Sequence, residues 1–148
     1  MSAQPFTVQD GLVAGVVAIN PTTGAINTSG NITGPTSVGF ANVPQNSKSQ
    51  DYTLAASDSG KHIFHPSADT SARAWTIPGN ETVAFEVGTA ITFINQNAAG
   101  VITIAITTDT MRLAGAGTTG SRTLAANGMA TAVKVTTTEW IIAGTGLT

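Results

Sequence analysis

The chain has 148 residues, enough for one ordinary domain or for a smaller domain with an extended arm. Hydrophobic residues make up 41% of it but charged residues only 9%, against about 25% in a typical soluble domain. The polar surface must therefore come mainly from Thr, Ser, Asn and Gln, which are easier to desolvate than charged groups. We therefore expect part of this surface to be a protein interface, and the chain to form oligomers.

The formal net charge is −2, and the basic residues stand apart from one another along the chain, as Lys48, Lys61, Arg73, Arg112, Arg122 and Lys134. Nucleic-acid binding requires a clustered positive surface, so this class is excluded. The absence of cysteine excludes disulfides and thiolate metal sites. No signal peptide is recognisable, and the longest apolar stretch, residues 12–19, is far below the ~20 residues of a membrane span. We expect a soluble protein made in the cytoplasm, with no membrane partner.

Residues 1–47 are predicted to form an extended β-arm. One apolar strand is indicated by Leu12, Val13, Val16, Val17 and Ile19, and Ile26 and Ile32 lie between Gly and Pro turns. Each piece is too short to bury a core of its own. We therefore expect these residues to be the attachment and oligomer interface, whose strands pair with another chain. A disordered N-terminal leader is the alternative.

Residues 48–148 are predicted to form an all-β domain, because short Thr-, Val- and Ile-rich strands recur between turn signals. The expected strands are residues 52–54, 62–65, 74–77, 90–95, 101–106, 111–113, 130–136 and 139–143. Residues 90–95 and 101–106 flank a turn at 97–100 and are predicted to pair as a hairpin. No segment has a capped helical stripe. This pattern is typical of a β-sandwich or a jelly-roll-like domain.

Several motifs are spread over roughly two-thirds of the chain, from about Lys48 to the end. They read Asp51-Tyr52-Thr53-Leu54, Ser57-Asp58-Ser59-Gly60-Lys61-His62, His65-Pro66-Ser67-Ala68-Asp69-Thr70, Trp75-Thr76-Ile77-Pro78, Gly88-Thr89-Ala90-Ile91-Thr92-Phe93-Ile94-Asn95, Leu113-Ala114-Gly115-Ala116-Gly117-Thr118-Thr119-Gly120 and Trp140-Ile141-Ile142-Ala143-Gly144-Thr145-Gly146. This part is similar to a β-module of the tail-fibre, head-fibre and decoration proteins of tailed phages. The resemblance implies a trimer at the surface of a virion and no catalytic activity.

The chain contains no long shaft and no heptad coiled coil, so a capsid decoration protein is favoured over a tail fibre. We expect a homotrimer assembled in the host cytoplasm, with the major capsid protein or another virion protein as partner. The alternative is a tail-fibre tip that recognises a host surface glycan. Its candidate receptor loops contain Asn97, Gly115, Gly117, Thr118, Thr119 and Arg122.

Other motifs have a structural interpretation. Residues 115–120 fit G-x-G-x-x-G, but a dinucleotide site needs a helix directly afterwards, and only a few residues precede the next turn. His62 and His65 are three residues apart, which places them on opposite faces of a strand and spoils a shared metal site. The alternative is a local turn that brings them together, with Asp58 or Asp69 as a further ligand. We therefore expect no metal and no other cofactor.

An enzyme is not indicated. No G-x-S-x-G nucleophile motif occurs. A carboxylate pair for glycan hydrolysis is conceivable, but the acidic side chains are predicted to occupy turns and edges on the solvated surface: Asp58, Asp69, Glu81, Glu86 and Asp109. Trp75 and Trp140 stand beside aliphatic residues and are predicted to pack in the core.

Overall fold

A computed structural model describes residues 17–19, 26–28 and 42–148 of the chain. The chain divides into two compact units, residues 1–41 and residues 42–148. β3 (Gln45–Ser47), which the sequence analysis places in the arm, pairs with a strand of the second unit. The boundary between the units therefore falls earlier than the expected position after residue 47.

In the first unit, β1 (Val17–Ile19) and β2 (Ile26–Thr28) pair antiparallel, with Ile19 opposite Ile26. Three of the predicted attachment residues, Val17, Ile19 and Ile26, lie on these two strands. The others lie outside the described residues: Leu12, Val13, Val16 and Ile32.

The second unit is made of β-strands, which confirms the predicted all-β class. After β3 come β4 (Tyr52–Thr53), β5 (His62–His65), β6 (Arg73–Ile77), β7 (Ala90–Asn95), β8 (Ile102–Ile106), β9 (Thr110–Leu113), β10 (Arg122–Thr136) and β11 (Glu139–Leu147). The one helical element among the described residues is a 3-10 turn, η1 (Ala56–Asp58). No helix in this part of the chain is long and apolar enough to cross a bilayer.

Six strands form two parallel ladders. β3, β5 and β7 pair in parallel as the first ladder, and β4, β6 and β8 pair in parallel as the second. Successive strands along the chain belong to alternate ladders, so the chain winds in three stacked turns. Each connection therefore crosses from one ladder to the other and does not reverse the chain within one ladder.

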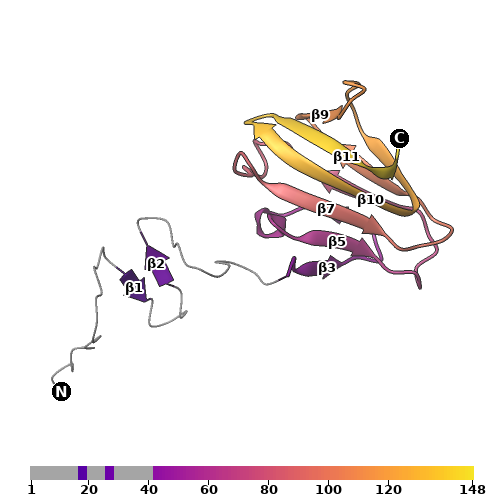
Figure 1. The fold of residues 1–148 in the computed structure, drawn as a ribbon, viewed down its shortest axis with the longest axis horizontal. Helices are drawn as coiled ribbons and strands as arrows, with labels where there is room; N and C mark the ends of the chain where they lie inside the picture. Colours follow the sequence, from indigo (N-terminus) through magenta and orange to yellow (C-terminus); the bar gives the residue numbers. More distant parts are fainter. Residues whose placement is uncertain (1–16, 20–25, 29–41) are drawn as a thin grey trace, which may run out of the picture. The chain divides into compact units, whose positions relative to one another are not determined.

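β10 joins the two ladders into one curled sheet of order β3-β5-β7-β10-β8-β6-β4. Its first residues pair antiparallel with β8, and residues 129–133 pair antiparallel with β7. The register is irregular between these two parts, where Asn127 has a φ of 58° and Gly128 lies against Leu124 and Ala125. β11 pairs with β10 and with β9, and Figure 1 shows β10 between β7 and β11.

The predicted hairpin of residues 90–95 and 101–106 is wrong in its pairing. Both segments are strands, β7 and β8, but they are not neighbours in the sheet, because each pairs with β10 on one side. On the other side they pair in parallel with β5 and β6 respectively. The turn at residues 97–100 therefore carries the chain from one ladder to the other.

The core lies between the two ladders. Trp75 of β6 stacks on Phe93 of β7 with ring centroids 6.2 Å apart, and both side chains are fully buried. Trp140 of β11 meets Phe85 edge-on at 5.5 Å. The rest of this cluster is mainly aliphatic: Leu54, Ile63, Ile77, Ile91, Ile102, Ile104, Met111, Leu124, Ala130, Ala132 and Ile142. The predicted core positions of Trp75 and Trp140 are confirmed.

Candidate functional site

The outward side of the sheet over β5, β7, β10 and β11 carries apolar side chains. The pairing register places Ile94 between Phe64 and Met129. It places Val133 beside Ile141. Because alternate residues of a strand point to opposite faces, these side chains lie opposite the buried residues of the same strands. We call this set the outer face, and it consists of Phe64, Ile94, Met129, Val133, Val135 and Ile141.

The outer face is open to solvent and uncharged. Met129 is 55% exposed, Val135 40% and Ile141 38%. The outward positions of β7 and β10 hold no Lys, Arg, Asp or Glu, and the Thr92 and Thr131 hydroxyls bond to each other at 2.9 Å. Charge occurs at the rim, where Arg112 Nε donates to Glu139 Oε1 at 2.7 Å. Exposed apolar area of this kind, rimmed by polar groups, is typical of a protein interface.

The predicted receptor loop, residues 114–122, is largely exposed, and several hydrogen bonds connect its residues. Leu113 N donates to Thr118 O at 2.8 Å, and Arg112 Nη1 donates to Gly117 O at 3.0 Å. Arg122 Nη2 donates to Thr118 O as well. The left-handed φ angles that glycine favours occur at Gly115, Gly117 and Gly120. The strand β10 follows, so the G-x-G-x-x-G segment is an inter-strand loop.

An open pocket of about 310 Å³ lies beside this loop. Hydroxyl groups dominate its lining, together with one carboxylate and two apolar residues: Thr107, Thr110, Thr119, Ser121, Asp109, Ile106 and Met111, with Gly120 completing the wall. Four of the predicted receptor residues are exposed in the loop, and Thr119 also lines the pocket: Gly115, Gly117, Thr118 and Thr119. The volume is at the lower limit of small-molecule sites.

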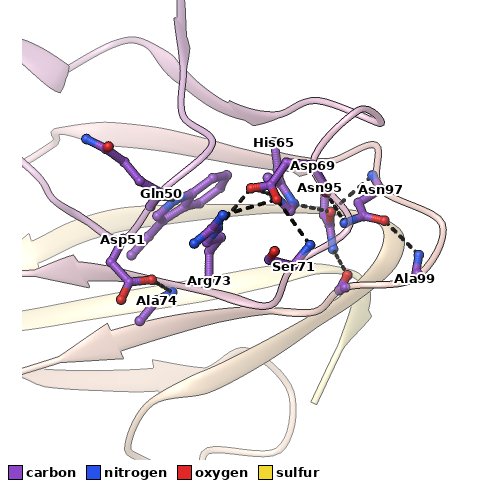
Figure 2. A network of polar contacts seen from close by, with 12 residues as sticks. Gln50, Asp51, His65, Asp69, Ser71, Arg73, Ala74, Asn95, Asn97 and Ala99 are labelled. Atoms are coloured by element: carbon purple, nitrogen blue, oxygen red, sulfur yellow. Dashed lines mark hydrogen bonds and ion pairs between the residues drawn. The ribbon is translucent and has the colours of Figure 1, made fainter.

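Asn97, another predicted receptor residue, is buried instead. Its Nδ2 donates to Asp69 O, and its Oδ1 accepts from Ala99 N at 2.7 Å, as Figure 2 shows. Neighbouring Asn95 is also buried, and its Nδ2 donates to Gly100 O at 2.9 Å. These amides hold the connection between β7 and β8, so Asn97 is structural and is not placed to contact a receptor.

His65 lies in a buried polar network that ties β5, β6 and β7 together (Figure 2). Its Nδ1 lies 3.0 Å from Asn95 Oδ1, and its Nε2 lies 3.0 Å from Asp69 Oδ2. Arg73 donates to both oxygens of Asp69, at 2.8 and 3.1 Å. These hydrogen bonds, from Arg73 first and His65 second, hold the pKa of Asp69 well below its usual range.

The His65 network contains no free nucleophile. Both ring nitrogens of His65 and both Asp69 oxygens already have protein partners. His62, by contrast, lies on the other face of β5, and its Nε2 is 3.1 Å from Gln45 Nε2. Within residues 42–148 and the two short strands, no three His, Cys, Asp or Glu side chains gather as a metal site. The network therefore serves to fix strand positions.

Asp58 and Asp109 correct the prediction that the acidic residues occupy the solvated surface, because they are 1% and 6% exposed. Asp58 accepts from Asn46 Nδ2 at 2.8 Å, Tyr52 OH at 2.7 Å and Ala55 N at 2.9 Å. Burial, and then the hydrogen bond to Asp58, raise the pKa of Tyr52. Sequence reasoning misses the cluster around Asp58. A short turn and a strand edge predict that a carboxylate is exposed, whereas the partners of Asp58 come from β3 and β4.

Comparison of the chain with protein-family models and with curated proteins finds no match.

Proposed function

We propose that the chain is a non-enzymatic structural protein of a tailed-phage particle, a homotrimer that decorates the capsid through its N-terminal arm. The observation that carries this proposal is the uncharged outer face on β5, β7, β10 and β11. A chain with so few charged residues needs partners to cover such a surface. The virion setting comes from the sequence resemblance of residues 48–148.

The proposed self-association uses the outer face and the arm together. Like surfaces of identical chains meet without electrostatic repulsion when they carry no charge, which suits a symmetric assembly. In the described residues, the outer edges of β3 and β4 have no strand partner. Such edges accept an added strand through main-chain hydrogen bonds. The arm directly precedes β3 in the sequence, so it is our candidate for strand exchange between subunits.

The proposed domain is sandwich-like, since the two ladders face each other across the Trp75–Phe93 contact. Its ladders pair in parallel, whereas jelly rolls are built of antiparallel strands. The carboxylates of Asp58 and Asp69 are engaged by protein donors, so neither is free to act in glycan hydrolysis.

The experiment has two arms. Sedimentation of the full chain should give a trimer. The double variant M129K/I141K places charge on the outer face, so the protein concentration at which the trimer dissociates should rise more than tenfold. Cosedimentation with capsids that lack this protein should show binding that requires residues 1–47. A monomeric wild type at high concentration, or equal capsid binding without residues 1–47, would contradict the proposal.

A second candidate function is a receptor-binding tip, and the pocket beside residues 114–121 favours it. Its hydroxyls suit a neutral saccharide, because such ligands offer many hydroxyl groups for hydrogen bonding. A glycan array probed with the full chain separates the two functions. Specific binding that T119V abolishes supports the tip, while no binding together with arm-dependent capsid attachment supports decoration.

A further inference from the structure

Lys134 is a charged residue at the inner side of β10, and it is fully buried. Its side chain has no exposed surface, and the residue as a whole is 1% exposed. Nζ donates to Asn80 Oδ1 at 2.8 Å, lies 3.9 Å from Asp109 Oδ2 and stands 5.6 Å above the Trp140 ring. Placing a lysine there costs stability unless it is well paired, because an ion loses its hydration on burial.

Asn80 is held in position opposite Lys134. Its backbone N donates to Asp109 Oδ1 at 3.0 Å. The turn that carries it closes with Thr82 N and Val83 N, which donate to Gly79 O at 2.9 and 3.0 Å. A Cβ on Gly79 would collide with Thr108, so the turn packs closely there. The backbone of Asn80 is therefore held in place, and its carboxamide faces the amine of Lys134.

Asp109 completes a trio of amine, carboxamide and carboxylate. One of its oxygens accepts from Asn80 N, while Oδ2 is buried, has no hydrogen-bond donor and faces Lys134 Nζ. The Trp140 ring lies over the amine, and Phe85 packs on Trp140 in turn. Nζ and Oδ2 lie 3.9 Å apart, so this carboxylate oxygen is the nearest candidate to receive a proton from the amine.

We propose that Lys134 and Asn80 form an intramolecular amide crosslink, with Asp109 as the proton carrier. Asp109 Oδ2 takes a proton from the Lys134 ammonium, and the neutral amine attacks Asn80 Cγ, which forms the new C–N bond. Asp109 passes this proton, and then a second one from Nζ, to Nδ2 as the Cγ–Nδ2 bond breaks. Ammonium leaves, and Asp109 returns to a carboxylate, so atoms, protons and charge balance without an oxidant.

The geometry suits this reaction, because the nucleophile and the carboxamide are already in contact. A fixed contact distance of this kind lowers the barrier by removing the entropy cost of bringing the groups together. Lysine amines act as nucleophiles when they are desolvated and neutral. Asp109 is also among the residues that line the open pocket beside residues 114–121.

The crosslink would join the turn after β6 to β10, across 54 positions of sequence. It would fasten β10, the strand that connects the two ladders, to the second turn of the winding, which consists of β5 and β6. A covalent link between distant positions restricts the unfolded chain, and longer closed loops gain more from it. This inference is independent of where the protein is located.

The test is mass spectrometry of the full chain purified in its folded state. Intact wild type should be lighter than its sequence mass by one ammonia, and tandem spectra of a protease digest should show a branched peptide that joins Asn80 to Lys134. The branched peptide is required, because Asn127-Gly128 is a sequence that can lose ammonia by cyclising locally. Only the branched species reports the proposed bond.

Two variants keep the test decisive. N80A removes the acceptor of the Lys134 amine and should abolish the branched peptide. D109N preserves shape and should slow bond formation by about 10²–10⁴-fold, the usual contribution of general acid–base catalysis. Folding of each is checked by circular dichroism. Linear Asn80 and Lys134 peptides from wild type after prolonged incubation would overturn the proposal, as would an ammonia loss that persists in N80A with no branched peptide.

Discussion

The two ends of the paired ladders are built differently. At one end, β3 and β4 have three and two residues and leave their outer edges unpaired within the described residues. At the other end, β10 and β11 have 15 and nine residues, and β10 closes both ladders. Short edge strands limit unwanted pairing, whereas a long bridging strand secures the core. The closed end therefore provides stability, and the open end remains available for another strand.

The largest expected effect is at the closed end. W140A removes a fully buried indole that packs on Phe85 and covers Lys134. We expect the free energy of unfolding to fall by about 3–5 kcal/mol, since large-to-small core substitutions lose transfer energy and leave a cavity. Urea denaturation followed by circular dichroism measures this. A loss under about 1 kcal/mol would mean that stability does not depend on the closed end.

G144A tests the close approach of β11 to β10. A Cβ at this position would overlap Met129 O and the Cα of Ala130, so the two strands must separate. We expect a loss of about 1–3 kcal/mol in the free energy of unfolding, the usual cost of overpacking. The matched control is A143S on the exposed side of the same strand, which should stay within about 0.5 kcal/mol of wild type.

Y52F tests the open end. It removes the hydrogen bond to Asp58, while Asn46 and Ala55 still donate to this carboxylate. We expect a loss of about 1 kcal/mol in the free energy of unfolding at neutral pH. The variant also has a pH signature. The folded pKa of Tyr52 is raised, so the stabilisation is complete below the unfolded value of about 10 and disappears as pH rises through the folded pKa.

In thermal melts at increasing pH, wild type should therefore lose stability above about pH 10 more steeply than Y52F does. Parallel pH curves for the two proteins would contradict this role of Tyr52. A loss of unfolding free energy in Y52F as large as that in W140A would contradict the conclusion that the closed end provides the stability.

The smallest effect on folding is expected from M129K. Its side chain is 55% exposed on the outer face, so the free energy of unfolding should change by no more than about 0.5 kcal/mol. Its self-association should nevertheless weaken, because a charge would have to be buried in the subunit contact. Sedimentation velocity, with V101K as a control outside the outer face, measures this. Unchanged association would remove the outer face from the proposed interface.

The sequence predicts strands better than it predicts their partners. The strand limits of β7 agree with the expected residues 90–95, because alternation of apolar residues is a local signal. The predicted hairpin pairing of β7 with β8 is wrong, since turn residues at 97–100 favour a hairpin locally. The actual partners of β7 are β10 and β5, and the parallel pairing with β5, about 30 residues earlier, cannot be predicted from the turn.

The site is less predictable for the same reason. Along residues 130–136 the alternation separates Val133 and Val135 from Ala130, Ala132 and Lys134. The structure buries the row that contains lysine and leaves the valines outside, the reverse of a simple hydrophobic-in pattern. This inversion is the signal that could have indicated both the outer face and a buried lysine. The partners of Lys134, however, come from distant turns.

The position of β10 and β11 after the six ladder strands in the sequence has a consequence for synthesis. The ribosome releases the six strands of the ladders before the strand that unites them, since a chain emerges from its N-terminus. The edges of β7 and β8 therefore have no strand partner on this side until β10 is made. A nascent chain that stalls before residue 122 leaves the two ladders unjoined at these edges, which makes premature truncation a route to aggregation.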